Sequence, residues 1–207
     1  MSSFCRTLFI SALLGLSAVN AWCGDNGGAG LAWGSQAEAD KIGFNTILGF
    51  KSSGPFDTAG NPILTVVSSF DWSLAAFICG QKNPDSYPQT TFGPVLTISG
   101  PTLCLTISEL EAANATISLQ PCVNDITANP VPTQMFQWIG TDYITYGFEF
   151  IGNQSVPVDP SSSTDYVPTL VPATNITGAY VRLDYLPDGL PASTGLETGM
   201  ILNLSDD

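Results

Sequence analysis

Short runs of β-branched and aromatic residues, each ended by Gly, Pro, Asn or Asp, recur along the sequence from Ile42 onward. Branched and ring side chains pack well on a pleated surface, and the turn residues stop each run. Short strands at close, fairly even spacing are typical of an all-β sandwich or barrel. We therefore expect an all-β fold, with strands near residues 63–67, 75–79, 95–98, 103–107, 116–119, 135–139, 143–151 and 179–183.

The first 21 residues have the three parts of a cleavable signal peptide. Arg6 lies near the start, residues 8–18 are apolar, and Ala21 is a small residue before a cleavage site ahead of Trp22. The apolar stretch is shorter than the ~20 residues that cross a bilayer. We expect residues 1–21 to be removed and the protein to be secreted, extracellular and free of membrane, with residues 22–207 forming one domain.

Charge and composition exclude several functions. The chain has 18 Asp and Glu residues, 5 Lys and Arg residues and no His, with a net charge of −13. Nucleic acids and anionic membranes would repel such a chain, because their binding depends on cations that neutralise phosphates. Without His, a Ser-His-Asp or Cys-His catalytic system and an imidazole metal site are impossible. We expect no cofactor, no metal and no nucleic-acid partner.

Four cysteines follow the signal segment, namely Cys23, Cys79, Cys104 and Cys122. An even number of cysteines in an exported chain predicts two disulfides. A zinc site is the alternative, although no two of these cysteines form a C-x-x-C pair.

Four Asn-x-Ser/Thr sequences also follow the signal segment. They begin at Asn114, Asn153, Asn175 and Asn203. In a secreted eukaryotic chain such an asparagine is an acceptor for an N-linked glycan. We expect these positions to lie in surface loops.

Two segments lack the strand pattern. Residues 22–41 begin with a glycine-rich stretch that has neither the lysine nor the strand and helix of a phosphate-binding loop. We expect a flexible N-terminal arm there, outside the repeats. Residues 156–177 are rich in Pro and Ser, and we expect a long polar loop.

One sequence unit recurs three times. The middle copy contains Cys104-Leu105, then Ser118-Leu119-Gln120-Pro121-Cys122, then Gln134-Met135-Phe136. Weaker copies precede and follow it, and the shift from Cys79 to Cys122 is within the ~20–50 residues of repeated units. Matching positions on alternating strands predict a buried core layer of Leu64, Leu105, Leu119, Phe136 and Leu183.

The middle copy resembles the repeat of ricin B-type lectin domains, in a divergent, secreted, fungal-type form. That repeat opens with a Cys-Leu pair, continues with an apolar strand ending in Pro-Cys, and closes with a Gln-x-aromatic motif. The resemblance implies a β-trefoil, a six-stranded barrel capped by three hairpins, over residues 42–207, with repeats at about 42–93, 94–140 and 141–207. It also implies a disulfide between Cys104 and Cys122, which leaves Cys23 to pair with Cys79.

The resemblance further implies where a sugar would bind. In the middle copy the matching positions are Thr106, Ser118, Gln120 and Gln134. Sugar-binding copies of the family have Asp at the position of Thr106 and an aromatic ring at the position of Gln120. The charged acceptor and the stacking surface are therefore missing, and we expect weak binding at this site. In the first copy, Phe77 stands at the aromatic position and is a second candidate.

Three functions are compatible with these features. The first is a non-catalytic, lectin-like protein that binds glycans or glycoproteins. The second is a β-trefoil module that binds proteins through its loops, such as a protease inhibitor or a secreted effector. The third is a glycoside hydrolase that uses paired carboxylates, with Glu109 and Glu111 or Asp142 and Glu149 as the candidates.

Overall fold

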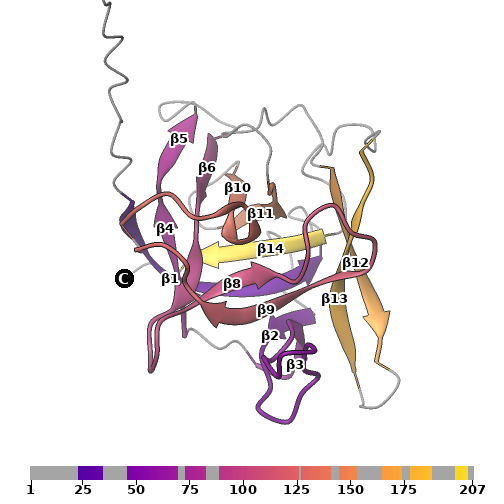
Figure 1. The fold of residues 1–207 in the computed structure, drawn as a ribbon. Helices are drawn as coiled ribbons and strands as arrows, with labels where there is room; N and C mark the ends of the chain where they lie inside the picture. Colours follow the sequence, from indigo (N-terminus) through magenta and orange to yellow (C-terminus); the bar gives the residue numbers. More distant parts are fainter. Residues whose placement is uncertain are drawn as a thin grey trace, which may run out of the picture.

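The protein is all-β in the computed structural model (Figure 1). The structure describes residues 23–34, 46–69, 73–82, 89–125, 127–140, 145–152, 165–173, 178–187 and 199–204. Within these ranges the only helical element is a single 3₁₀ turn, η1 (Pro132–Gln134). The all-β class predicted from the sequence is therefore confirmed. The predicted signal peptide, residues 1–21, lies outside the described residues.

The described strands are hydrogen-bonded to one another in a single antiparallel sheet, in which many neighbours are not consecutive in the sequence. They are β1 (Gly24–Gly34), β2 (Thr46–Gly49), β3 (Thr65–Val67), β4 (Leu74–Ile78), β5 (Gly80–Lys82), β6 (Gln89–Gly93), β7 (Val95–Thr97), β8 (Leu103–Ile107), β9 (Ala115–Pro121), β10 (Phe136–Gly140), β11 (Thr145–Phe150), β12 (Tyr166–Pro172), β13 (Ala179–Tyr185) and β14 (Gly199–Leu204).

Six of these strands close into a ring. β1 pairs with β4 and β14, β14 pairs with β11, β11 with β10, and β10 with β6. The ring closes where β4 meets the end of β6: the Phe77 N–H donates to the Pro94 oxygen at 3.0 Å, and the Cys79 N–H donates to the Phe92 oxygen at 2.9 Å. A closed ring has no unpaired edge that could recruit another chain.

Three hairpins, β2–β3, β8–β9 and β12–β13, extend from this ring (Figure 1). Their second strands meet one another. The Leu64 N–H donates to the Ile117 oxygen at 2.8 Å, the Val181 N–H donates to the Leu64 oxygen at 2.9 Å, and Leu183 pairs with Ala115. All five residues are buried, so the hairpins share one contact region in the core.

The core is lined by side chains from the ring and from the hairpins. The predicted core residues, Leu64, Leu105, Leu119, Phe136 and Leu183, are all buried, which confirms the predicted strand phase. Phe136 is fully buried and stacks on Phe148, with ring centroids 5.0 Å apart, and meets Phe150 edge-on at 5.3 Å. These rings fill the interior on the side of β10 and β11.

The structure corrects the prediction for the glycine-rich segment. Residues 24–34 form β1, the longest strand, instead of an arm outside the repeats. Leu31, Ala32 and Trp33 pair with β14 on one side and with β2 on the other. Glycines supply the same backbone N–H and C=O groups as other residues, so two paired neighbours hold a segment whose propensity alone disfavours a strand.

The alignment of the first copy is also shifted by one strand. The sequence matched residues 74–79 to the strand that ends at Cys122, which lies in the β8–β9 hairpin. In the structure β4 instead lies in the ring beside β1, as β10 does beside β6 and β11. Alternating apolar residues occur in both kinds of strand, so the pattern alone does not distinguish them.

Part of the expected polar loop is a strand. Residues 166–172 form β12, which pairs with β13 along its whole length. Pro168 and Pro172 are tolerated because the described partner of β12 is β13 alone, and a proline can face the open side of an edge strand without removing a ladder hydrogen bond.

Candidate functional site

Both predicted disulfides are present. Cys104 and Cys122 join β8 to the residue after β9, with their Cα atoms 5.0 Å apart, and Cys23 and Cys79 join the start of β1 to the end of β4. Two disulfides are consistent with folding in an oxidising compartment, because cytosolic thiols are kept reduced.

Gln134 is part of the interior and not of an open cleft. Its side chain is 2% exposed. Its Nε2 donates to Thr106 Oγ1 at 2.9 Å and to the Pro121 oxygen at 3.1 Å, while its Oε1 accepts the Val123 N–H at 3.1 Å. Thr106 is also buried, with an exposed fraction of 5%. The amide of the closing motif thus satisfies backbone groups beside β8 and β9, and neither residue is accessible to a sugar in this conformation.

Ser118 and Gln120, the other two predicted residues of the middle copy, lie on the same face of β9 and contact a carboxylate that the sequence analysis did not identify. Ser118 Oγ donates to Asp57 Oδ2 at 3.0 Å. Gln120 Nε2 donates to Ser118 Oγ at 2.9 Å and lies 3.4 Å from Asp57 Oδ2. This carboxylate comes from the loop between β2 and β3.

Asp57 also organises its own loop, residues 50–64 between β2 and β3. Its Oδ1 accepts the Ala59 N–H at 2.9 Å and the Asn61 N–H at 2.8 Å, and Asn61 Nδ2 donates to Oδ2 at 3.0 Å. Burial raises the pKa of Asp57, but the hydrogen bonds from Asn61, Ser118 and Ala59 outweigh it, so the pKa lies below its ordinary value of 3.8. We call Asp57, Asn61, Ser118 and Gln120 the Asp57 cluster.

Phe56 lies directly before Asp57, and 49% of its surface is exposed. The backbone of Phe56 forms a bridge with Pro62, which fixes the base of the loop. Gly54, at φ +92°, lies against the ring: a Cβ there would be 2.9 Å from ring carbons Cδ2 and Cε2 of Phe56. A side chain at residue 54 would therefore displace the ring and strain the backbone. The loop holds an exposed aromatic side chain next to a set of fixed polar groups.

Phe77, the predicted aromatic residue of the first copy, lies elsewhere. It is half-buried in β4, where its backbone pairs with β1 and closes the ring to Pro94. None of the described contacts connects it to the Asp57 cluster. Phe56 and Asp57 were missed in the sequence because only the strands of the repeats were searched, although Asp57-Thr-Ala-Gly-Asn61 is a sequence typical of a tight turn.

Each hairpin turn contacts the next hairpin through a different polar group. The β2–β3 loop meets β9 through the Asp57 cluster. The β8–β9 turn meets β13 through the Asn114 N–H, which donates to Asp184 Oδ1 at 3.0 Å. The third junction joins β13 to β3, where Thr65 Oγ1 donates to the Ala179 oxygen at 2.6 Å. Among these three described junctions, only the first has an exposed aromatic residue next to one of its polar residues in the sequence, since Phe56 precedes Asp57.

A small hollow lies next to Gln134, with Pro94, Cys104, Asn124 and Pro130 also among its lining residues. Its volume of about 10 Å³ is close to the ~10–15 Å³ that holds a single water molecule. The hollow is therefore too small for a sugar.

Of the carboxylates considered for hydrolysis, Glu109 and Glu111 are both exposed in the turn between β8 and β9. Glu149 is less exposed and lies on β11, and its suggested partner Asp142 is outside the described residues. Gln137, opposite Glu149 on β10, donates its Nε2 to Glu149 Oε2 at 2.8 Å. Burial raises the pKa of Glu149, and this hydrogen bond opposes the change only in part.

The raised pKa of Glu149 predicts a pH-dependent stability. At pH near 4 the carboxyl is largely neutral in both the folded and the unfolded chain, but as pH rises through the folded pKa the buried carboxyl must ionise, which destabilises the fold. Glu149→Gln should therefore be more stable than wild type in urea melts at pH 7, and the difference should shrink toward pH 4. Glu109→Gln, the control at an exposed position, should have the same stability as wild type at pH 7 and at pH 4. A Glu149→Gln advantage that grows on acidification would contradict this assignment.

The fold and the site together define an all-β, disulfide-linked protein with a polar cluster at one hairpin junction. Comparison with known proteins finds no matching family, no matching curated protein and no matching solved structure. Among the described residues, no helix is long and apolar enough to span a membrane, and no three Asp, Glu, Cys or His side chains group in a way that could hold a metal ion.

Proposed function

We propose that this protein is a secreted, non-catalytic β-trefoil that binds glycans or glycoproteins through the β2–β3 loop. Two features support the trefoil: a ring of six strands, and three hairpins whose second strands meet in the core. The ricin B-type resemblance of residues 94–140 implies the same arrangement. The two disulfides and the signal-like segment at residues 1–21 support secretion.

Two observations carry the proposal: the Asp57 cluster is ordered, and the residue before Asp57 in the same loop is the exposed Phe56. The nonpolar face of a sugar ring stacks on an aromatic ring, while its hydroxyls need donors and acceptors nearby. Asp57 already accepts hydrogen bonds from Asn61, Ser118 and Ala59, so it acts as a positioning residue. By holding the amide Nε2 of Gln120 and Nδ2 of Asn61, it leaves their amide oxygens for the sugar hydroxyls.

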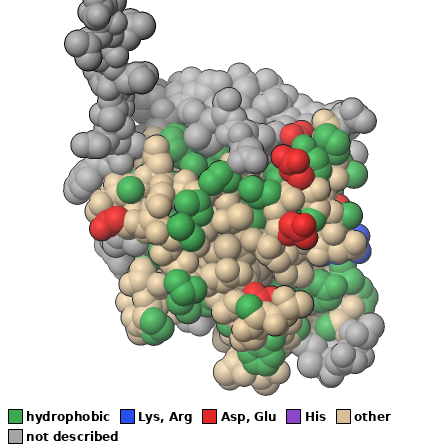
Figure 2. Space-filling model, in the orientation of Figure 1, with side chains coloured by type: hydrophobic (Ala, Val, Ile, Leu, Met, Phe, Trp, Pro, Cys, Tyr) green, Lys and Arg blue, Asp and Glu red, His purple; other side chains and the backbone are tan. Residues whose placement is uncertain are grey.

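The charge of the protein restricts the glycan. Figure 2 shows Asp and Glu side chains over this face and Lys or Arg only at one edge, in agreement with the net charge of −13. A sulfated or uronic-acid glycan would be repelled by this net negative charge, since Lys51 is the one cation of the β2–β3 loop and its Nζ lies near Gly178. The proposed ligand is therefore a neutral glycan, bound weakly at one site and more strongly through several copies of the sugar.

Glycan titration tests the proposal. Galactose, mannose and N-acetylglucosamine, each free and displayed on a polymer, are titrated into the secreted protein after enzymatic deglycosylation. Phe56→Ala and Gln120→Ala should each weaken binding of the retained sugar by about tenfold, which corresponds to ~1.4 kcal/mol. Ile98→Ala is the matched control, since Ile98 is an exposed apolar residue (59%) in a different turn, and it should bind as wild type. Binding that survives both site changes would place the sugar elsewhere.

A second candidate function uses the same loop. The bridge between Phe56 and Pro62 and the Asp57 hydrogen bonds hold the β2–β3 loop in one conformation, and the loop projects from the molecule (Figure 1). A preorganised loop with an exposed aromatic side chain suits the binding of a protein partner, because little conformational entropy is lost on binding. No binding to any displayed sugar, in protein that is otherwise folded, would favour this candidate.

A further inference from the structure

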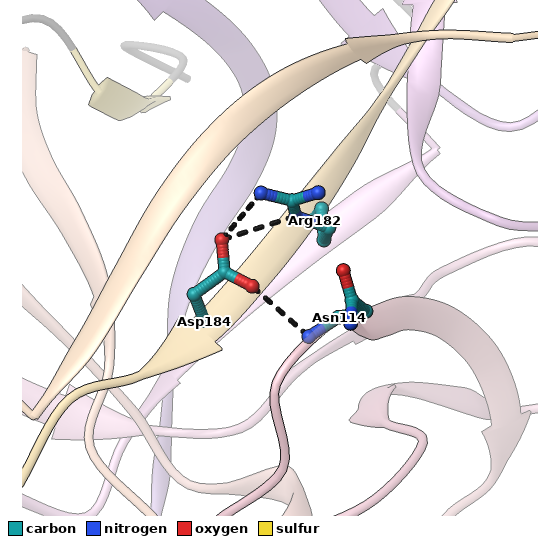
Figure 3. A network of polar contacts seen from close by, with 3 residues as sticks. All are labelled: Asn114, Arg182 and Asp184. Atoms are coloured by element: carbon teal, nitrogen blue, oxygen red, sulfur yellow. Dashed lines mark hydrogen bonds and ion pairs between the residues drawn. The ribbon is translucent and has the colours of Figure 1, made fainter.

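The turn between β8 and β9 presents an asparagine in a fixed conformation. Asn114 is exposed and has φ 66°, a left-handed conformation that asparagine tolerates better than most residues. Its backbone N–H donates to Asp184 Oδ1 at 3.0 Å, while Arg182 Nη2 and Nε donate to Asp184 Oδ2 at 2.7 and 3.0 Å (Figure 3). The ion pair thus anchors the backbone of the turn, and the hydrogen bond to Asp184 uses the main chain of Asn114 and not its side-chain amide.

Asn203 has the same kind of sequence but the opposite environment. It lies inside β14, paired with Gly30 of β1 on one side and with Thr145 of β11 on the other. Its Oδ1 is buried and has no hydrogen-bond partner in the described structure. Asn203 is half-buried, so a branched glycan on this side chain would crowd the strands on either side, β1 and β11.

We infer that Asn114 is an N-glycosylation site of the folded protein and that Asn203 is not. In the reaction, Asn114 Nδ2 attacks C1 of an oligosaccharide linked to a lipid diphosphate. The new N–C1 bond forms as the C1–O bond to the diphosphate breaks, Nδ2 loses one proton, and the lipid diphosphate leaves. Thr116 supplies the hydroxyl that completes the acceptor sequence.

The position of this glycan bears on the proposed binding loop. Asn114 precedes β9, whereas Gln120 lies near the other end of that strand. Six residues of extended chain span roughly 20 Å. The attachment point of a glycan at Asn114 therefore lies in the β8–β9 turn next to β13, at the opposite end of β9 from Gln120. The inference itself stands on the turn geometry and does not depend on glycan binding.

Mass spectrometry of the secreted protein tests the inference. The full chain, including residues 1–21, is expressed in a eukaryotic secretory host, and intact mass is measured before and after treatment with an amidase that removes N-linked glycans. Asn114→Gly, which keeps the positive φ, and Thr116→Ala should each lose the mass of one glycan. Thr116→Ser, which preserves the acceptor sequence, should keep it, and Asn203→Gln should have the same glycan mass as wild type.

Two results would overturn the inference. One is a glycan mass that is the same in Asn114→Gly as in wild type. This result would also be found if the wild-type protein were secreted without a glycan at Asn114. The other is conversion of Asn203 to Asp by the amidase, detected in the peptide that contains residues 199–204. Because Asn114→Gly and Thr116→Ala alter different side chains, a folding defect in one does not remove the test.

Discussion

Phe136→Ala should lower the free energy of unfolding by about 3–5 kcal/mol, the range for truncation of a large aromatic core residue. Phe136 is fully buried, stacks on Phe148 and meets Phe150 edge-on, so the change removes both apolar burial and two ring contacts. The neighbouring rings come from β11, and a cavity between β10 and β11 would weaken two adjacent strands of the ring. Urea denaturation followed by tryptophan fluorescence measures the loss.

The control for this variant is Ile98→Ala, which truncates an exposed side chain in the β7–β8 turn. It should change stability by no more than ~0.5 kcal/mol. If Phe136→Ala and Ile98→Ala had similar small effects, the aromatic interior described here would not be the core of the protein.

Removal of the Cys23–Cys79 disulfide by replacement of both cysteines with Ala should destabilise the protein by about 4 kcal/mol. Removal of Cys104–Cys122 should cost about 3 kcal/mol. The difference follows from the sequence separations of 56 and 18 residues, because a cross-link that closes a longer loop restricts the unfolded chain more strongly. Loss of Cys23–Cys79 also frees the start of β1, the strand that links β4, β14 and β2.

Denaturant melts of the two double variants, compared with the wild type in its oxidised form, give the two values. The ranking is the sharper result, since both variants replace two cysteines by the same residue. A larger loss on removal of Cys104–Cys122 would mean that β1 is held in place chiefly by its strand pairing and not by the disulfide.

The all-β class and the core residues could be predicted from the sequence because each depends on local signals, and the disulfide pairing was implied by the resemblance of the middle copy. Leu105 and Leu119 alternate with polar neighbours on their strands, and Cys104 and Cys122 bracket one repeat. Such patterns report which face of a strand is buried and do not require knowledge of the partner strand.

The strand β1 could not be predicted from the sequence, because this segment is held in a strand by its pairing with β2, β4 and β14. Gly24 to Gly34 has a low intrinsic preference for a strand, and its partner β14 lies at the other end of the sequence. Pairing on both sides outweighs that preference. The same holds for β12, where a full register with β13 accommodates two prolines.

The candidate site could be predicted only in part. Ser118 and Gln120 do lie together, but Gln134 and Thr106 are buried in the interior. The residues that complete the site come from a loop much earlier in the sequence, since Asp57 and Ser118 are 61 positions apart. A carboxylate supplied by that loop leaves no trace in the spacing of the middle copy. The Asp57-Thr-Ala-Gly-Asn61 turn was visible in the sequence, whereas its contact with β9 was not.

The antiparallel pairing of β1 with β14 also sets the order of events during biosynthesis. Residues 29–34 lie against residues 199–204, so the ring cannot close until nearly the whole chain described here has been synthesised. Until then β1 and β11 each expose an unpaired edge, the kind of edge that other chains can join. We therefore expect a nascent chain of this topology to need protection until its last strand is made, and a chain that ends before residue 199 to be prone to aggregate.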